Sequence, residues 1–284
     1  MFENIFEQFH RDGYVLIDNF LSSEETEELK NEINKVIDEM PPQTETAIFS
    51  TDDNEALKNQ YLLDSADKVS FFYEKGAVGG DGELLVDPHL AFNKIGHTLH
   101  RDNQLFRKIS FDERVKEVCF QLKMAEPVIV QSMYIFKNPK IGGEVLPHQD
   151  ASYLYTEPLK TIGFWIALDD ATLENGCLWF ARGSHKSGVH RRFIRNPDPA
   201  ADPPLMYTGP SPHYQKSSFT AVPVKKGSCI LIHGQVVHSS ESNKSDKQRN
   251  AYTFHVIEQK NTKYCSKNWC QAKDGVFMNV YRNV

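Results

Sequence analysis

Two histidines and an aspartate in this chain have the spacing of a metal site. His148 and Asp150 form a His-x-Asp pair, and His238 follows about ninety residues downstream. Two imidazoles and one carboxylate can occupy one face of an octahedral Fe(II) and leave the other positions open. The pattern therefore predicts a non-haem iron centre that uses 2-oxoglutarate and O2, and hence an oxygenase.

A single His-x-Asp pair is a weak signal, because this chain contains three of them. His10 and Asp12 precede the first predicted strand, and residues 100–102 begin a predicted helix, where positions i and i+2 diverge. Residues 148–150 instead follow a strand and a glycine turn in the strand-rich half of the chain. Since positions i and i+2 of a strand face the same side, we assign the metal to this third pair.

The second histidine must come from a later strand, where His233, His238 and His255 are the candidates. Arg249 favours His238, because an arginine eleven residues later can lie on the neighbouring strand and face the same cavity. Its guanidinium suits a bidentate bond to a carboxylate. Charge supports the combination, since Arg249 would balance the negative charge that a 2-oxoglutarate dianion brings to the Fe(II) site.

Composition narrows the class of protein. A chain of 284 residues can bury a substantial core, and its net charge of −6 argues against a general nucleic-acid binder. The five cysteines form no C-x-x-C pair, which favours reduced thiols over a disulfide framework. No apolar run approaches the ~20 residues of a membrane span, and the N-terminus is acidic. We expect a cytoplasmic protein without a membrane partner; its oligomeric state is not encoded in these features.

The elements that position the candidate residues change along the chain. Residues 14–17 are expected to form a strand, Ser22 and Glu25 to cap a helix that ends before Pro41, and residues 98–122 to be helical. The dipeptide Asn175-Gly176 predicts a hairpin. Later strands are predicted at residues 128–136, 161–169, 177–181, 221–224, 228–233 and 250–258. This order favours a mainly β protein with helices packed on a double-sheet, cupin-like jelly roll.

Two further segments have open interpretations. Half of the 14 prolines fall within residues 197–223, which predicts either a lid or a proline-stiffened surface loop. Residues 190–195 form a basic cluster that includes Arg191 and Arg192. This cluster could recognise a phosphate, a carboxylate or a CoA group, or it could be a solvated charged loop.

Several longer segments are similar to one known family. These segments are residues 12–21, 67–74, 93–97, 147–150, 174–178, 183–185 and 238–240. The chain thereby resembles the phytanoyl-CoA dioxygenase family over most of its length. The His-x-Asp, His and Arg set is shared by a whole superfamily, whereas the stretch 67–97 is much more specific. One departure is Arg182, which stands where the family often has proline before its Gly-Ser-His turn.

The resemblance implies a double-stranded β-helix with His148, Asp150 and His238 as iron ligands. It also implies a binding site for 2-oxoglutarate, formed by Lys94, Met133, Trp165, Ser240 and Arg249. Arg249 and Ser240 would hold the distal carboxylate, with Trp165 as an apolar wall and Lys94 as a second cation. Because related iron enzymes that bind halide replace the aspartate by a small residue, Asp150 favours hydroxylation.

We therefore expect one dioxygenase domain over residues 1–284, with a helical elaboration at about 1–125 and a β-helix core at about 126–260. The expected substrate is a small molecule, such as an acyl-CoA or another anionic metabolite. A non-catalytic jelly-roll protein that senses 2-oxoglutarate is the alternative from another class. A zinc hydrolase with the same three ligands would leave Arg249 and Lys94 without a role.

Overall fold

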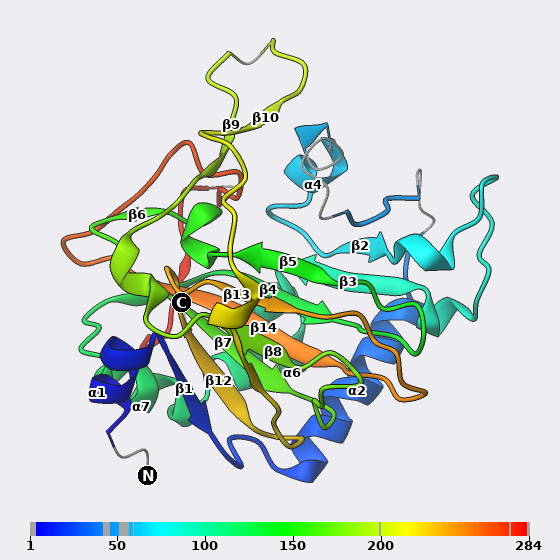
Figure 1. Cartoon of the computed structure of the whole chain (residues 1–284), viewed down its shortest axis with the longest axis horizontal. Helices are drawn as coiled ribbons and strands as arrows, with labels where there is room; N and C mark the ends of the chain where they lie inside the picture. The colour runs from blue at the N-terminus through cyan, green and yellow to red at the C-terminus, as the bar shows by residue number, and fades with distance from the viewer. Residues whose placement is uncertain are drawn as a thin grey trace.

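Two antiparallel sheets of unequal size form the framework of the protein (Figure 1). The structure, a computed structural model, describes residues 4–41, 46–50, 57–58, 60–198, 200–272 and 274–282. The larger sheet has the order β1-β12-β7-β14-β4-β3-β2, with β16 paired to β4. Its strands are β1 (Tyr14–Ile17), β2 (Ser70–Tyr73), β3 (Phe92–His97), β4 (Pro127–Ile135), β7 (Thr161–Ala167), β12 (Cys229–His233), β14 (Ala251–Glu258) and β16 (Met278–Asn279).

The smaller sheet has the order β11-β8-β13-β5. Its strands are β5 (Val145–His148), β8 (Leu178–Phe180), β11 (Thr220–Val222) and β13 (His238–Ser240). Two short pairs lie outside both sheets, namely β9 (Phe193–Arg195) with β10 (Leu205–Tyr207) and β6 (Thr156–Glu157) with β15 (Lys263–Tyr264). The β9–β10 hairpin projects from the rest of the molecule (Figure 1).

Helices cover the outer face of the larger sheet. They are α1 (Ile5–Asp12), α2 (Ser23–Asp38), α5 (Leu99–Asp102), α6 (Gln104–Ser110) and α7 (Glu113–Gln121). The short helix α4 (Gln60–Asp64) lies apart from them, and its Leu62 and Leu63 pack against a different cluster (Figure 1). Leu29 of α2 and Phe106 of α6 belong to the same buried cluster as Phe164 and Phe254 of the sheet. The rings of Phe164 and Phe254 stack 4.7 Å apart. None of the described helices is long and apolar enough to cross a membrane.

The inner face of the larger sheet carries the residues of interest, because side chains alternate between the two faces of a strand. Trp165 lies between Phe164 and Ile166 in β7 but packs in a different cluster, with Phe180 of the smaller sheet. Residues paired across neighbouring strands form two rows on this face. The first row is Gly96, Met133, Thr253, Trp165 and Ile230, and the second is Gln131, His255, Gly163 and Ile232. Two sheets that enclose such a face form a double-stranded β-helix, which confirms the expected fold class.

The predicted hairpin at Asn175-Gly176 is wrong. Strands β7 and β8 on either side of it lie in different sheets. The backbone does turn there, since Gly176 has a φ of 87° and the Asn175 side chain accepts a hydrogen bond of 2.7 Å from the Thr172 amide. An Asn-Gly turn thus carries the chain from the larger sheet to the smaller one.

The N-terminal region contributes strands as well as helices, because β1, β2 and β3 all join the larger sheet. The proline-rich segment 197–223, described except for residue 199, is not one loop either. It provides β10 of the projecting hairpin and β11 of the smaller sheet. Whether the segment closes over the site remains a prediction.

The start of α2 provides a test of the local structure. The Ser22 hydroxyl accepts from the Glu25 amide at 3.2 Å, and the Glu25 carboxylate accepts from the Ser22 amide at 2.8 Å. We expect Ser22→Ala to lower the free energy of unfolding by about 1 kcal/mol, because one amide of the first turn loses its acceptor. Urea denaturation measures the change, with Ser23→Ala as the matched control. Equal effects of the two variants would contradict this cap.

Candidate metal centre

The candidate metal ligands meet where β5 pairs with β13. His148 ends β5 and lies directly opposite His238, the first residue of β13. Asp150 follows in a short 3₁₀ turn. The Asp150 Oδ1 atom is 3.8 Å from Nε2 of His148 and 3.7 Å from Nε2 of His238. Among the described residues, this is the one group of three whose ligand atoms approach one another closely enough, within 4.8 Å, to hold a metal ion.

Backbone carbonyls determine the tautomer of both histidines. Nδ1 of His148 donates to the Leu146 carbonyl at 2.9 Å, and Nδ1 of His238 donates to the Val236 carbonyl at 3.1 Å. Because a carbonyl can only accept, the proton stands on Nδ1 and the Nε2 lone pair faces Asp150. Burial also lowers the pKa of His148 to about 4. A neutral imidazole with a free Nε2 is the form that binds metal.

His255 supports Asp150 from the larger sheet. Its Nε2 lies 3.3 Å from Oδ2 of Asp150, a close contact rather than an aligned hydrogen bond. The Gln131 amide nitrogen lies 3.2 Å from Nδ1 of His255; since that nitrogen donates, the His255 proton stands on Nε2 and faces the carboxylate. A side chain at Gly163 would meet Oδ2 at 3.1 Å, so glycine leaves room for this approach. Burial opposes ionisation of Asp150, but His255 and His238 hold its pKa well below the usual range.

Two buried cations, Arg249 and Lys94, form no ion pair with the residues that the structure describes. Arg249 is 1% exposed, and its Nε and Nη1 atoms make no hydrogen bond. Its guanidinium lies 5.3 Å from the Trp165 ring. Lys94 is 9% exposed, and its Nζ lies over the rings of Phe49 at 4.3 Å and Phe72 at 4.8 Å.

Burial lowers the pKa of Lys94 to about 7 and that of Arg249 to about 10. Uncompensated buried charge is costly. The residues present therefore fit a dianion such as 2-oxoglutarate, whose carboxylates would supply the missing partners.

The other residues predicted for the co-substrate lie on the same inner surface. Met133 and Trp165 share one row of the larger sheet, and Lys94 is two residues from Gly96 of that row. Ser240 is buried on β13, two residues beyond His238. A residue that sequence analysis missed, Lys137, donates to the Ser240 hydroxyl at 2.8 Å.

The proposed substrate arginines lie beside the projecting hairpin. The Arg191 guanidinium stacks 3.8 Å from the Tyr207 ring of β10, and Arg192 lies 4.1 Å from the Tyr155 ring. Arg192 also donates to Asn268 at 3.3 Å, yet its buried Nε has no acceptor. A chain of ring contacts links this region to the metal centre, from His148 through Tyr153 and Phe193 to Tyr207.

The remaining His-x-Asp pairs have other partners. Asp12 binds Arg11 and Arg182, which together hold its pKa at about 2, so Arg182, which stands where the family often has proline, pairs with the end of α1. Asp102 accepts from the Thr98 hydroxyl at 2.6 Å, while His100 contacts the Ser132 hydroxyl at 2.8 Å. Both pairs stand apart from the group around Asp150.

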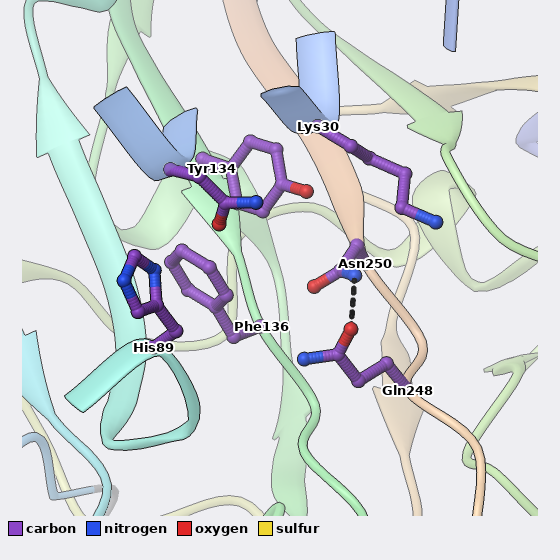
Figure 2. A pocket seen from close by; sticks show the side chains of 7 residues that line it. Lys30, His89, Tyr134, Phe136, Gln248 and Asn250 are labelled. Carbon is purple, nitrogen blue, oxygen red and sulfur yellow. Dashed lines mark hydrogen bonds between the residues drawn. The ribbon is translucent and has the colours of Figure 1, made fainter. Parts of the chain in front are cut away.

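A cavity of about 180 Å³ lies on the opposite, helix-covered face of the larger sheet (Figure 2). It is lined by Lys30, Asn34, His89, Tyr134, Phe136, Gln248 and Asn250. Tyr134 and Phe136 alternate along the chain with Met133 and Ile135 and pack in the outer cluster. The cavity is therefore separate from the metal centre, although Gln248 and Asn250 flank Arg249 in the chain.

Fold and site together define a double-stranded β-helix protein with a candidate His-x-Asp and His metal centre. The chain belongs to the phytanoyl-CoA dioxygenase family, whose model matches residues 9–251. A Danio rerio protein named phytanoyl-CoA dioxygenase domain-containing protein 1 is 44% identical over 274 residues, which cover 94% of each chain. The Bos taurus protein of the same name is 46% identical over 93% of each chain. An Arabidopsis thaliana phytanoyl-CoA dioxygenase is 41% identical over 93% of this chain and 91% of the plant protein.

Solved structures at lower identity share the fold. The epimerase SnoN from nogalamycin biosynthesis superimposes with a TM-score of 0.59 at 17% identity, over 90% of this chain and 82% of SnoN. EctD from S. alaskensis, in a crystal structure with 2-oxoglutarate and 5-hydroxyectoine, superimposes with a TM-score of 0.60 at 16% identity, over 92% of this chain and 77% of EctD.

The contact between His255 and Asp150 yields a prediction about metal affinity. We expect His255→Leu to raise the dissociation constant for Fe(II) about ten- to hundredfold, because groups that orient a ligating carboxylate contribute to that extent. Anaerobic calorimetric titration with Fe(II) measures it. His233→Leu is the control, since the His233 ring packs against His185 and Phe9 instead. A larger loss in the control than in His255→Leu would overturn the assignment.

Proposed function

We propose that the protein is an Fe(II)- and 2-oxoglutarate-dependent dioxygenase. The observation that carries this proposal is the combination of three converging ligand atoms with Arg249 and Lys94, two buried cations that form no ion pair within the described part of the chain. Membership of the phytanoyl-CoA dioxygenase family supports it. When bound, the iron and 2-oxoglutarate would supply the oxidising chemistry, with O2 consumed and the co-substrate converted to succinate and CO2.

Each residue has a distinct role in this proposal. His148, Asp150 and His238 hold the iron, with their protonation states fixed beforehand by the carbonyl contacts and by His255. Arg249 and Ser240 bind the distal carboxylate of 2-oxoglutarate. Lys94 adds a second positive charge, and Trp165 and Met133 provide apolar walls. The whole chain would act as one domain, because β1, β2 and β3 of the N-terminal region complete the larger sheet.

Hydroxylation of a small anionic molecule is the reaction we infer. Asp150 keeps its carboxylate in the metal set, which leaves no ligand position for halide. The unpaired Nε of Arg192 and the stacked Arg191 favour a substrate with a phosphate or carboxylate, such as an acyl-CoA. The similar structures of SnoN and SnoK are described as an epimerase and a carbocyclase, so the product must be measured rather than assumed from the fold.

Aerobic turnover of 2-oxoglutarate tests the dioxygenase proposal. With Fe(II), the wild type is expected to form succinate, and His238→Ala to form none, because a ligand is lost. Arg249→Ala should need at least about thirtyfold more 2-oxoglutarate, since a buried charged partner of the carboxylate is removed. His233→Ala is the control and should retain turnover.

Two results would reject this function. Intact 2-oxoglutarate that stays tightly bound in air, with or without candidate substrates, would favour a sensor. Hydrolysis that depends on zinc and ignores 2-oxoglutarate would favour a hydrolase.

The arginine cluster is tested separately. Once an anionic substrate is known, the double variant Arg191→Ala/Arg192→Ala should raise its KM about tenfold or more, because charge-assisted hydrogen bonds are lost. The KM for 2-oxoglutarate should stay constant, since the clamp at Arg249 is intact. Lys186→Ala on the preceding turn is the control for loss of a nearby positive charge. An unchanged substrate KM in the double variant would refute the recognition role.

A further inference from the structure

Lys137 is a buried lysine with a complete set of oxygen partners. It follows β4 and is 2% exposed. Its Nζ donates to the Gly143 carbonyl at 2.7 Å, to the Glu241 carbonyl at 2.7 Å and to the Ser240 hydroxyl at 2.8 Å. An ammonium group has three donors and no acceptor, so these three oxygens satisfy it fully.

The backbone is shaped around the alkyl chain of this lysine. A side chain at Gly142 would meet Lys137 Cγ at 2.6 Å, and one at Gly176 would meet Lys137 Cδ at 2.7 Å. These glycines come from two separate loops. Since burial of a lysine is costly, a cage with glycine on two sides and three acceptors at the end indicates a specific position for the ammonium group.

The charge of Lys137 results from opposing influences. Burial, followed by the charge of Arg249, lowers its pKa to about 6, whereas the carboxylates of Glu74 and Glu144 raise it. The three oxygen acceptors also favour the ammonium form, because they hydrogen-bond to the charged group. A bound dicarboxylate nearby would act in the same direction.

The contact with Lys137 determines what the Ser240 hydroxyl can do. A hydroxyl has one proton, and its oxygen here accepts from Lys137. The Ser240 proton is thus left to donate elsewhere. Without the ammonium group, the Ser240 oxygen would lose this donor, and the contact would no longer fix the direction of its proton.

The main chain of Lys137 contacts the other carboxylate-binding residue. Its carbonyl accepts from the Arg249 amide at 3.1 Å and from the Asn243 side chain at 2.8 Å. One residue therefore contacts both proposed partners of the distal carboxylate, Ser240 through the side chain and Arg249 through the backbone.

We propose that Lys137 is a positioning residue of the co-substrate site, which orients the Ser240 hydroxyl so that its proton is donated to the distal carboxylate of 2-oxoglutarate. This inference rests on the proposed function, because it requires that 2-oxoglutarate binds beside Arg249. Lys137 itself need not touch the co-substrate, since its three N–H groups are already bonded within the protein.

The experiment compares two ligands that differ at the distal carboxylate. Fe(II)-loaded protein is titrated anaerobically by calorimetry with 2-oxoglutarate and with pyruvate, a 2-oxo acid without that carboxylate. Lys137→Met keeps an unbranched side chain as long as the alkyl part of lysine and removes the ammonium group. We expect it to raise the dissociation constant for 2-oxoglutarate about tenfold and that for pyruvate less than about twofold.

Two further variants identify the route of the effect. Ser240→Ala should weaken the binding of 2-oxoglutarate but not that of pyruvate. The double variant Lys137→Met/Ser240→Ala should bind 2-oxoglutarate no more weakly than Ser240→Ala alone, because both substitutions act through one hydroxyl. Lys140→Met, three residues away and on the surface, is the charge control and should bind both ligands as the wild type does.

The outcomes are distinct. Equal weakening of both ligands by Lys137→Met, or additive effects in the double variant, would overturn the proposal and indicate a structural role. If circular dichroism shows that Lys137→Met does not fold, the Ser240→Ala variant provides the test. An unchanged affinity of Ser240→Ala for 2-oxoglutarate would then overturn the proposal. A wild type that binds both ligands equally, or neither, would reject the proposed co-substrate site itself and this inference with it.

Discussion

The pairing of β5 with β13 is the constraint on which the site depends. It places His148 directly opposite His238, so that two imidazoles face the same space. Because side chains alternate along a strand, a slip of one residue would turn one histidine to the other face. Strand β13 also pairs with β8, and the Phe180 ring stacks against His238 at 5.7 Å. The register of the smaller sheet is thereby held from both sides.

Hydrogen bonds within the protein set the polarity of the site before any ligand binds. Carbonyls hold the protons of His148 and His238, Gln131 sets the proton of His255, and Lys137 sets that of Ser240. Such prearrangement limits the reorganisation that binding requires. The exception is the guanidinium of Arg249, whose unpaired Nε and Nη1 leave buried charge that a dicarboxylate can compensate.

Local sequence was sufficient for some of these features and not for others. The cap at Ser22 and the choice of the pair at 148–150 follow from residues close in the chain. The hairpin was wrong because Asn-Gly fits a left-handed turn whichever sheet the next strand joins. Lys137 gave no signal, since its burial depends on Gly142 and Gly176 from separate loops. The contact between His255 and Asp150 depends on the register of β4, β14 and β7, so the sequence alone suggested His255 only as an alternative metal ligand to His238.

The architecture separates the tasks that this proposal requires. The metal ligands lie on and just after the smaller sheet, whereas Lys94, Met133 and Trp165 lie on the larger one. Arg191 and Arg192 belong to neither sheet, because they precede the projecting β9–β10 hairpin. In the proposed function, substrate recognition thus lies beside that hairpin, apart from the proposed ligands of the iron and of 2-oxoglutarate. The ring contacts from His148 through Tyr153 and Phe193 to Tyr207 are the physical connection between the two parts.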